Sequence, residues 1–203
     1  MTISLAQPFN QKIRIAGLRV AVAALLPVLL LATPALGGLP AALLHGAGIL
    51  CIVAAVLGRF WAILYIGGHK NQRLMQDGPY SLCRHPLYLS STLGAAGFGL
   101  MQQSLTLTLL AGGVIFAILT ATAAREERDL RRIFGSAYDA YAQRVPRILP
   151  DLSGFATPRH VTFDSGTLRR NMRDALVFLS LIPLAEGLNW LHAARLLHGI
   201  VLP

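Results

Sequence analysis

With 203 residues, of which 54% are hydrophobic and only 13% charged, the chain is too apolar for a soluble domain of its size. Its composition fits a polytopic membrane protein, in which residues 1–203 form a single membrane domain of about four or five spans. The net charge of +9 does not indicate a nucleic-acid partner, because the apolar blocks leave no soluble basic domain. We attribute it to the excess of Lys and Arg that cytoplasmic loops of membrane proteins carry.

Two long apolar stretches come first. Residues 15–36 predict a first membrane span preceded by basic residues. This pattern also resembles a signal peptide, with Ala32–Ala35 as a candidate cleavage region, but a retained span is favoured because no soluble domain follows. An uncharged turn leads to a second span over residues 39–66, which exceeds the hydrocarbon thickness, so its end should reach the interface.

A polar cytosolic loop over residues 67–86 precedes a short third apolar stretch, residues 87–101. The turn 102–104 then leads into a fourth span over residues 105–123. So short a link predicts that the third and fourth helices form an antiparallel hairpin. The third stretch is rich in small residues, which let helix backbones or a ligand approach closely.

Residues 124–150 are polar and amphipathic, and predict a cytosolic helix that continues the fourth span, with a break at Gly135. Its apolar positions at helical spacing are Leu130, Phe134, Tyr138 and Tyr141. Residues 151–173 are interpreted as a loop. The apolar block 175–194 is interrupted by Pro183 and Glu186, and it predicts either a fifth span or a re-entrant helix.

The predicted fold is therefore all-α: an integral membrane protein with about five transmembrane helices, a helical hairpin and a cytosolic amphipathic helix. Lys and Arg concentrate in the N-terminal segment, the 67–86 loop and the 124–173 segment, and are absent from the turns 33–40 and 102–104. All basic segments lie on one side if the N-terminus is cytoplasmic, which we expect.

The most distinctive stretch is a polar island, residues 77–91, between apolar blocks. Gly78-Pro79 indicates a turn, and Pro86 stands where a helix would begin. Polar side chains gather around that helix entrance: Tyr80, Arg84, His85 and Tyr88. At a membrane boundary such a cluster favours a functional site, although on its own it could also serve as a helix cap.

Two further elements belong to the same expected site. Gly97-Phe98-Gly99 lies in the third stretch, where helix packing is the ordinary explanation for glycines. Glu126-Glu127 follows the fourth span, where a solvated ion-pair face is the ordinary explanation for acids beside arginines. Their position at the mouth of one hairpin suggests a common role.

Two motifs occur in order along the chain. The first is Gly78-Pro-Tyr…Arg84-His-Pro-Leu-Tyr88, and the second is Glu126-Glu127-x-x-Leu130…Phe134-Gly135-x-x-Tyr138-x-x-Tyr141…Val145-Pro-Arg147…Pro150. Together they resemble the isoprenylcysteine carboxyl methyltransferase family over about residues 59–150, under half of the chain. Membrane phospholipid methyltransferases share the Gly-x-Gly and Glu-Glu elements.

The resemblance implies an integral-membrane enzyme that uses S-adenosylmethionine, releases S-adenosylhomocysteine, and needs no metal. It implies catalytic roles for Arg84 and Glu127. The residues that it implies for the cytosol-facing cofactor pocket are Tyr80, His85, Pro86, Tyr88, Gly97, Gly99, Glu126 and Glu127. Which of Glu126 and Glu127 faces the cofactor stays open. Ser90 departs from the family, which usually has glycine there.

The chemistry suits these residue types, because the cofactor brings its own leaving group and the protein mainly positions the reactants. The apolar walls suggest a lipophilic acceptor from the bilayer: a prenylcysteine carboxylate, a lipid amine or a thiol. A carboxylate acceptor is already ionised at pH 7 and needs no general base. The sequence does not select among these acceptors, and it does not indicate an oligomeric state.

Two alternatives remain at the level of sequence. A sterol-type reductase using NADPH has a similar Arg-His-Pro entrance, but Leu87 and Ser90-Ser91 stand where that class has Asn and an acidic residue. A non-catalytic membrane protein would give the paired motifs no role.

Cys51 and Cys83 are not expected to form a disulfide or a metal site; Cys83 is either an ordinary loop residue or a reactive thiol.

Overall fold

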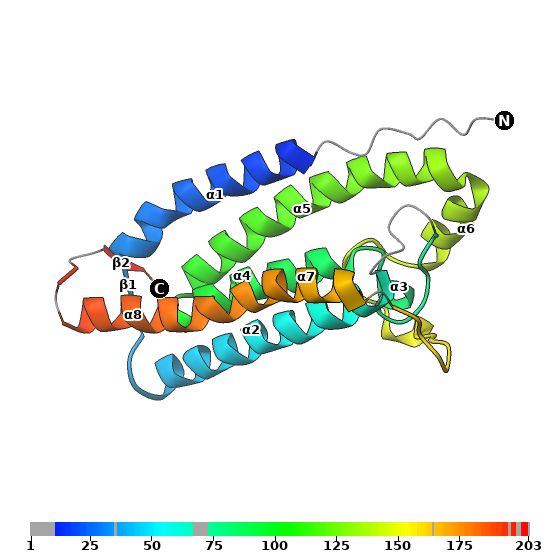
Figure 1. Cartoon of the computed structure of the whole chain (residues 1–203). Helices are drawn as coiled ribbons and strands as arrows, with labels where there is room; N and C mark the ends of the chain where they lie inside the picture. Colours follow the sequence, from blue (N-terminus) through cyan, green and yellow to red (C-terminus); the bar gives the residue numbers. More distant parts are fainter. Residues whose placement is uncertain are drawn as a thin grey trace.

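The computed structural model is almost entirely helical (Figure 1). It describes residues 11–34, 36–66, 73–163, 165–194, 196–197 and 200–202. The helices are α1 (Gln11–Leu31), α2 (Gly38–Ile66), α3 (Pro79–Leu82), α4 (Pro86–Met101), α5 (Leu105–Phe134), α6 (Ser136–Arg144), α7 (Ser165–Leu176) and α8 (Leu181–Ala193), with 3-10 turns η1 (Leu152–Gly154) and η2 (Val177–Ser180) and strands β1 (Ala32–Pro34) and β2 (Ile200–Leu202). The prediction of an all-α membrane fold is confirmed, apart from these two short strands.

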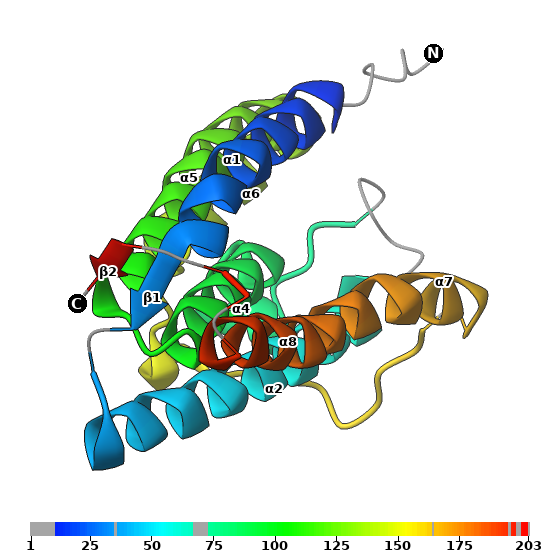
Figure 2. The ribbon, with the colours of Figure 1, turned by 90° about the vertical axis from the view of Figure 1, so that its left-hand side faces the viewer.

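Helix α4 lies at the centre of the molecule, between α2 and α5, with α8 beside it (Figure 2). Its glycines permit this close packing. A Cβ on Gly97 would lie 2.9 Å from the carbonyl oxygen of Gly48 in α2, and a Cβ on Gly99 would lie 2.5 Å from Cα of Thr108 in α5. The small residues of α4 therefore let two neighbouring helix backbones approach it from different sides.

The predicted hairpin between α4 and α5 is confirmed. Gln103 takes up a positive φ of 56° in the turn. Ser104 is the N-cap of α5, and its hydroxyl oxygen accepts a hydrogen bond from the backbone N–H of Leu107. The turn thus reverses the chain within three residues.

Three described helical stretches are long and apolar enough to cross a membrane: Gly38–Ile66, Leu105–Phe134 and Met172–Ala193. The apolar part of α1, Ile15–Leu31, is shorter. Helix α4 has 16 residues, about 24 Å, and is enclosed by its neighbours. Large apolar side chains such as Leu43, Leu50 and Leu57 of α2 are exposed on the outer surface, as expected for a helix that faces lipid.

The first span was expected over residues 15–36, but the helix ends at Leu31. Ala32–Pro34 instead forms β1, which pairs in parallel with β2 near the other end of the chain, with Ala32 opposite Ile200. Pro34 has no N–H to donate and disfavours a helical residue before it, which accounts for the early end. Helix α1 runs along α5 (Figure 2).

Helix α5 continues well past its apolar part. We take residues 105–123 as the membrane-spanning part and residues 124–134 as the part that extends beyond it. The predicted break occurs at Gly135, whose φ is 56° and whose N–H donates to the carbonyl of Arg131 at 2.9 Å. After α6 the chain is irregular from Val145 to Asp151, so the predicted helix over residues 124–150 ends earlier than expected.

The interpretation of residues 151–173 as a loop is wrong in its second half, because α7 begins at Ser165. Leu168, Met172 and Ala175 recur at helical spacing, and Ala175 is fully buried where α7 packs on α2. The arginines between them gave the segment the polar composition of a loop.

The last apolar block runs through η2 into α8, antiparallel to α2 (Figure 1). Pro183, in the first turn of α8, has no N–H and cannot donate the helical hydrogen bond to the carbonyl four residues before it. The chain just before it has the 3-10 geometry of η2, which agrees with the loss of this hydrogen bond. By length and composition, Met172–Ala193 favours a span rather than a re-entrant helix.

The close packing of α4 on α2 can be tested with Gly97→Ala. The new methyl group would lie 2.9 Å from the backbone oxygen of Gly48, and we expect the variant to lose about 1–3 kcal/mol of stability. Thermal unfolding in mild detergent, followed by circular dichroism, measures this loss. The matched control is Gly113→Ala, because no other described element comes within 4 Å of the added methyl group. Equal melting temperatures for the two variants would contradict the packing.

Candidate active site

The chain enters α4 through a turn that only glycine can form. Gly78 has a φ of 58°, and a Cβ there would collide with the ring of Tyr65. The carbonyl of Gly78 accepts a hydrogen bond from Ser81 Oγ at 2.7 Å, which closes the short helix α3. His85 is then the N-cap of α4 and Pro86 its first residue, where a missing N–H costs little.

Residues 145–157 wrap around this entrance. The backbone N–H of Arg84 donates to the carbonyl of Pro146 at 2.9 Å, and that of His85 donates to the carbonyl of Arg147 at 3.0 Å. These bonds fix the backbone of both predicted site residues. They also bring the end of the second motif against the first.

Three buried tyrosines support the same region. Tyr141 Oη donates to the carbonyl of Tyr80 at 2.7 Å, and the rings of Tyr138 and Tyr141 meet edge to face at 6.0 Å. Burial raises the pKa of Tyr138 to about 12 and raises the pKa of Tyr80 and of Tyr141 as well. All three therefore stay neutral at pH 7 and can act as hydrogen-bond donors.

Glu127 is the centre of the charged cluster. Its side chain is 0% exposed, and its two carboxylate oxygens accept one hydrogen bond each from Nε and Nη2 of Arg147, both at 2.9 Å. Nη2 of Arg84 lies 3.3 Å from Oε1 of Glu127, and the Arg84 side chain is only 10% exposed. A bidentate contact plus a second guanidinium is a strong and directional arrangement.

Burial by itself would raise the pKa of Glu127. The contacts of the carboxylate with His85 and Arg147, and the charge of Arg84, outweigh burial and lower the pKa to about 2. The hydrogen bonds to Glu127 in turn raise the pKa of Arg147. Glu127 is thus a fixed negative charge with both oxygens engaged, which does not suit a general base.

His85 joins the charged cluster to the aromatic side chains. Its ring stacks on Tyr88, with 5.2 Å between centroids and 9° between planes. Nε2 of His85 lies 3.4 Å from Oε1 of Glu127, and Nδ1 lies 3.8 Å from Oε2 of Glu126. Glu126 is 20% exposed, so it lies at the edge of the cluster, where a ligand can reach it.

Three polar atoms of this region are buried and have no hydrogen-bond partner among the described residues. They are Tyr80 Oη, Arg84 Nε and Tyr138 Oη. Buried polar groups in native proteins are almost always paired, with protein, water or a ligand. Because Arg84 lies against Glu127, its unpaired Nε is a candidate contact for a bound molecule.

Cys51 and Cys83 form no disulfide, in agreement with the sequence interpretation. Cys83 is buried, and burial raises the pKa of its thiol to about 11. Since the thiolate is the reactive form, this favours an ordinary structural residue over a reactive thiol.

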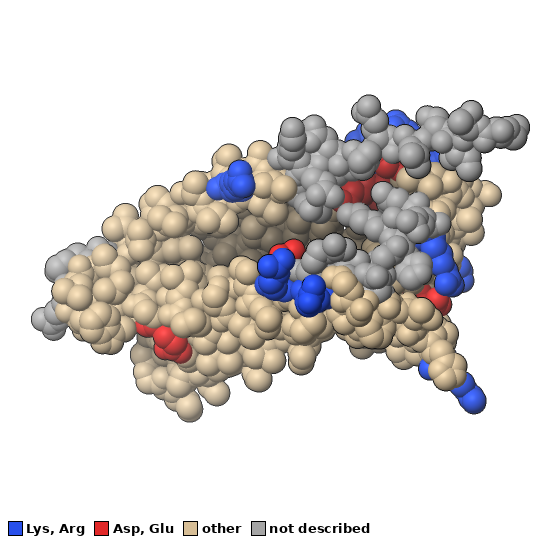
Figure 3. All heavy atoms as spheres, viewed as in Figure 1, with Lys and Arg blue, Asp and Glu red and all other residues tan. Residues whose placement is uncertain are grey.

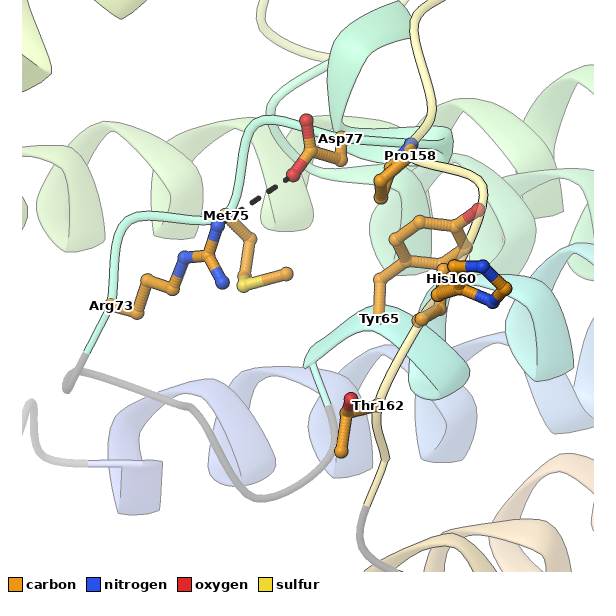
Figure 4. Close-up of a pocket in the computed structure, with 8 residues that line it drawn as sticks. Tyr65, Arg73, Met75, Asp77, Pro158, His160 and Thr162 are labelled. Carbon is orange, nitrogen blue, oxygen red and sulfur yellow. Dashed lines mark ion pairs between the residues drawn. The ribbon is translucent and has the colours of Figure 1, made fainter.

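A separate pocket of about 250 Å³ lies between the end of α2 and the loop before α7 (Figure 4). Its lining residues are Tyr65, Arg73, Met75, Asp77, Pro158, His160, Val161 and Thr162. Arg73 and Asp77 face each other there at 4.0 Å. None of the site residues predicted from the sequence lines this pocket.

Comparison with known proteins gives the family. A family model described as phospholipid methyltransferase matches residues 37–137. The protein-S-isoprenylcysteine O-methyltransferase of Schizosaccharomyces pombe is 30% identical over 82 residues, which are 40% of this chain and 35% of that protein. Isoprenylcysteine O-methyltransferase B of Arabidopsis thaliana is 28% identical over 91 residues, 45% of this chain and 46% of that protein.

The chain belongs to this family of membrane methyltransferases.

A longer match is the cobalt-zinc-cadmium resistance protein CzcN of Cupriavidus metallidurans, 36% identical over 154 residues, 76% of this chain and 71% of that protein. That name describes a phenotype of its own organism and says nothing of a reaction. In the described part of this chain, no three His, Cys, Asp or Glu side chains are placed to hold a metal ion. No solved structure matches the chain.

Within this methyltransferase, the structure brings together most of the residues predicted for the site. Those in or against the cluster are Tyr80, Arg84, His85, Pro86, Tyr88, Glu126 and Glu127. Gly97 and Gly99 are instead packed against α2 and α5, toward the other end of α4. The sequence interpretation did not assign Arg147, although the Val145-Pro-Arg147 element of the second motif was the signal for it.

Proposed function

We propose that this membrane methyltransferase takes its methyl group from S-adenosylmethionine and transfers it to a lipophilic acceptor. The observation that carries the proposal is the entrance to α4, where His85, Tyr88 and Glu126 adjoin a buried carboxylate held by two arginines. Family membership adds that a methyl group is what is transferred.

The residues present fit this cofactor. Glu126 would hold its ammonium group or its ribose hydroxyls, and Nε of Arg84 is a buried donor suited to its carboxylate. The stacked rings of His85 and Tyr88 offer an aromatic surface for its cationic or adenosyl part. When bound, S-adenosylmethionine supplies an activated methyl group on a positively charged sulfur.

In this proposal the protein mainly positions the reactants. Glu127 orients Arg84 and His85 through its contacts rather than by exchanging a proton, because both of its oxygens are engaged with Arg147. We therefore propose that Glu126 faces the ligand and that Glu127 supports it. Reactions of this kind depend on orientation, so small displacements of the support are expected to reduce the rate strongly.

The acceptor is proposed to enter from the bilayer. Figure 3 shows an elongated hollow between the side of the molecule formed by α1 and α5 and the side formed by α7 and α8, with mostly uncharged atoms on its visible walls. Such a surface suits a lipid-soluble molecule. Carboxylate, amine and thiol acceptors all remain open, and only the carboxylate needs no base.

We also propose that the N-terminus and the site face the cytoplasm. The site lies at the end of the molecule formed by the end of α2, α3 and α6, and the surrounding segments carry most of the arginines. Cytoplasmic segments of membrane proteins carry this excess of positive charge.

The function is tested by titrating the protein in mild detergent with S-adenosylmethionine and S-adenosylhomocysteine, by calorimetry, with NADPH as the reductase control. We expect both adenosyl compounds to bind and NADPH not to bind. Glu126→Gln should weaken binding at least tenfold, because it removes a charge at the edge of the site. The matched control is Asp129→Asn, one turn along α5, where the acid pairs with Arg132 on the exposed face.

Absence of adenosyl binding to folded protein would overturn the methyltransferase proposal. A response to NADPH would favour the reductase, and no response to any of the three would favour a non-catalytic role. If Glu126→Gln binds S-adenosylhomocysteine as tightly as Asp129→Asn does, the role given to Glu126 is wrong.

A further inference from the structure

The segment from residue 149 to α7 exposes an unusual amount of apolar surface for a polar connection. The exposed large apolar side chains along it are Leu149, Leu152, Phe155, Val161, Phe163, Met172 and Leu176. In water such a run would be unfavourable, and contiguous exposed apolar side chains usually indicate a contact surface.

Two contacts place this segment at the boundary of the membrane. The ring of Phe155 lies 6.0 Å from the ring of Trp61, an exposed residue in the last two turns of α2. The ring of Phe178, just after α7, lies 4.8 Å from the guanidinium carbon of Arg59, also in α2. Phe155 is thus level with the last two turns of a spanning helix, where tryptophan is enriched in membrane proteins. Phe178 is level with Arg59, seven residues before the end of the same helix.

In the orientation proposed above, the arginines of α7 lie farther toward the cytoplasm than Phe178. Arg169 and Arg173 are nine and five residues before Phe178 in a helical segment, which places them about 14 and 8 Å beyond it along the helix. Both side chains are exposed, and they lie four residues apart on one face. That is the depth of the phospholipid headgroups.

The charge of the segment favours anions. Residues 155–176 contain four arginines and two aspartates. Figure 3 shows Lys and Arg atoms over α7 and at the tip of the loop that precedes it. Apolar side chains at the boundary with cationic side chains above them match a leaflet that carries anionic lipids.

We propose that α7 and the loop before it form a binding surface for anionic phospholipid headgroups of the cytoplasmic leaflet, with Arg169 and Arg173 as its main contacts. The surface is distinct from the cluster around Glu127. It is connected to that cluster through the backbone, because the N–H of Gly78 donates to the carbonyl of Ala156 at 2.7 Å. Bound anionic lipid should therefore stabilise the loop that supports the entrance to α4.

The experiment uses the full chain in a neutral detergent, with phosphatidylglycerol or phosphatidylcholine of the same acyl chains added. The melting temperature is followed at increasing lipid concentration. We expect phosphatidylglycerol to reach half of its effect at a concentration at least fivefold lower than phosphatidylcholine. The difference should shrink in high salt, because headgroup attraction is screened.

Arg169→Gln with Arg173→Gln should abolish at least half of this preference. The matched control, Arg125→Gln with Arg128→Gln, removes two exposed arginines from α5 and should keep it. The pair Arg169→Lys with Arg173→Lys preserves the charge and should also keep it. Equal effects of the two lipids on the unmodified protein would overturn the proposal. The proposal would also be overturned if the variant with both glutamines in α7 kept the preference for phosphatidylglycerol. It would be overturned as well if the α5 control variant or the variant with both lysines lost that preference.

Discussion

Glu127→Gln is expected to lose about 3–5 kcal/mol of stability, which would lower the melting temperature by roughly 10 °C. The reason is the uncompensated charge that the substitution leaves behind. Arg84 is only 10% exposed and faces Glu127 at 3.3 Å, so its charge would stay largely buried. Arg147 would also lose both of its hydrogen bonds to Glu127. Thermal unfolding in detergent, followed by circular dichroism, measures the loss.

The preceding residue provides the control for this prediction. Glu126→Gln removes the same charge from the same helix at a 20% exposed position, and its effect on stability should be much smaller. A double variant, Arg84→Met with Glu127→Met, should lose less than the sum of the two single methionine variants, because it removes both buried charges together. The prediction fails if the melting temperatures of Glu127→Gln and Glu126→Gln differ by about 2 °C or less, which corresponds to about 1 kcal/mol. The cluster would then not be a stabilising centre.

The entrance to α4 could be predicted from the sequence because its signals are local. Gly78 demands a positive φ, Pro86 marks a first helical turn, and Gly135 marks a helix break, each within a few residues. Apolar stretches and the short turn at 102–104 likewise define the hairpin by themselves. These features do not depend on what the rest of the chain does.

The orientation of the acid pair could not be predicted in the same way. Glu126 and Glu127 are neighbours on a helix with polar residues on both sides, so the local pattern does not reveal which one points inward. Arg147, on a segment beyond α6, determines it by binding both oxygens of Glu127. Long-range pairings of this kind, like that of β1 with β2, leave no periodic signal in the sequence.

The two glycines of α4 show a limit of short motifs. Residues two apart on an α-helix are separated by about 200° around its axis, so Gly97 and Gly99 face different neighbours. Gly97 meets α2 and Gly99 meets α5. In a membrane helix the Gly-x-Gly pattern therefore indicates close helix contacts on two sides as readily as a cofactor contact.

Acidification should remove the stabilising contribution of Glu127 in a defined range of pH. The ordinary pKa of this carboxyl is 4.5, and the folded protein lowers it to about 2. A lowered pKa means that the contribution is fully present above about pH 4.5 and is lost as the pH falls toward 2, where the folded state also binds the proton. The difference in pKa corresponds to about 3 kcal/mol.

This contribution can be isolated from that of the other carboxyl groups by comparing two proteins. The melting temperatures of the unmodified chain and of Glu127→Gln are measured between pH 7 and pH 2.5, and their difference is plotted against pH. We expect a constant difference above about pH 5 and a steady decrease below it, because only the unmodified protein has this carboxylate to lose. A difference that stayed the same down to pH 2.5 would mean that folding does not lower the pKa of Glu127. The contacts with His85, Arg84 and Arg147 would then not favour the ionised carboxylate, and the support that we assign to Arg84 and His85 would have to come from elsewhere.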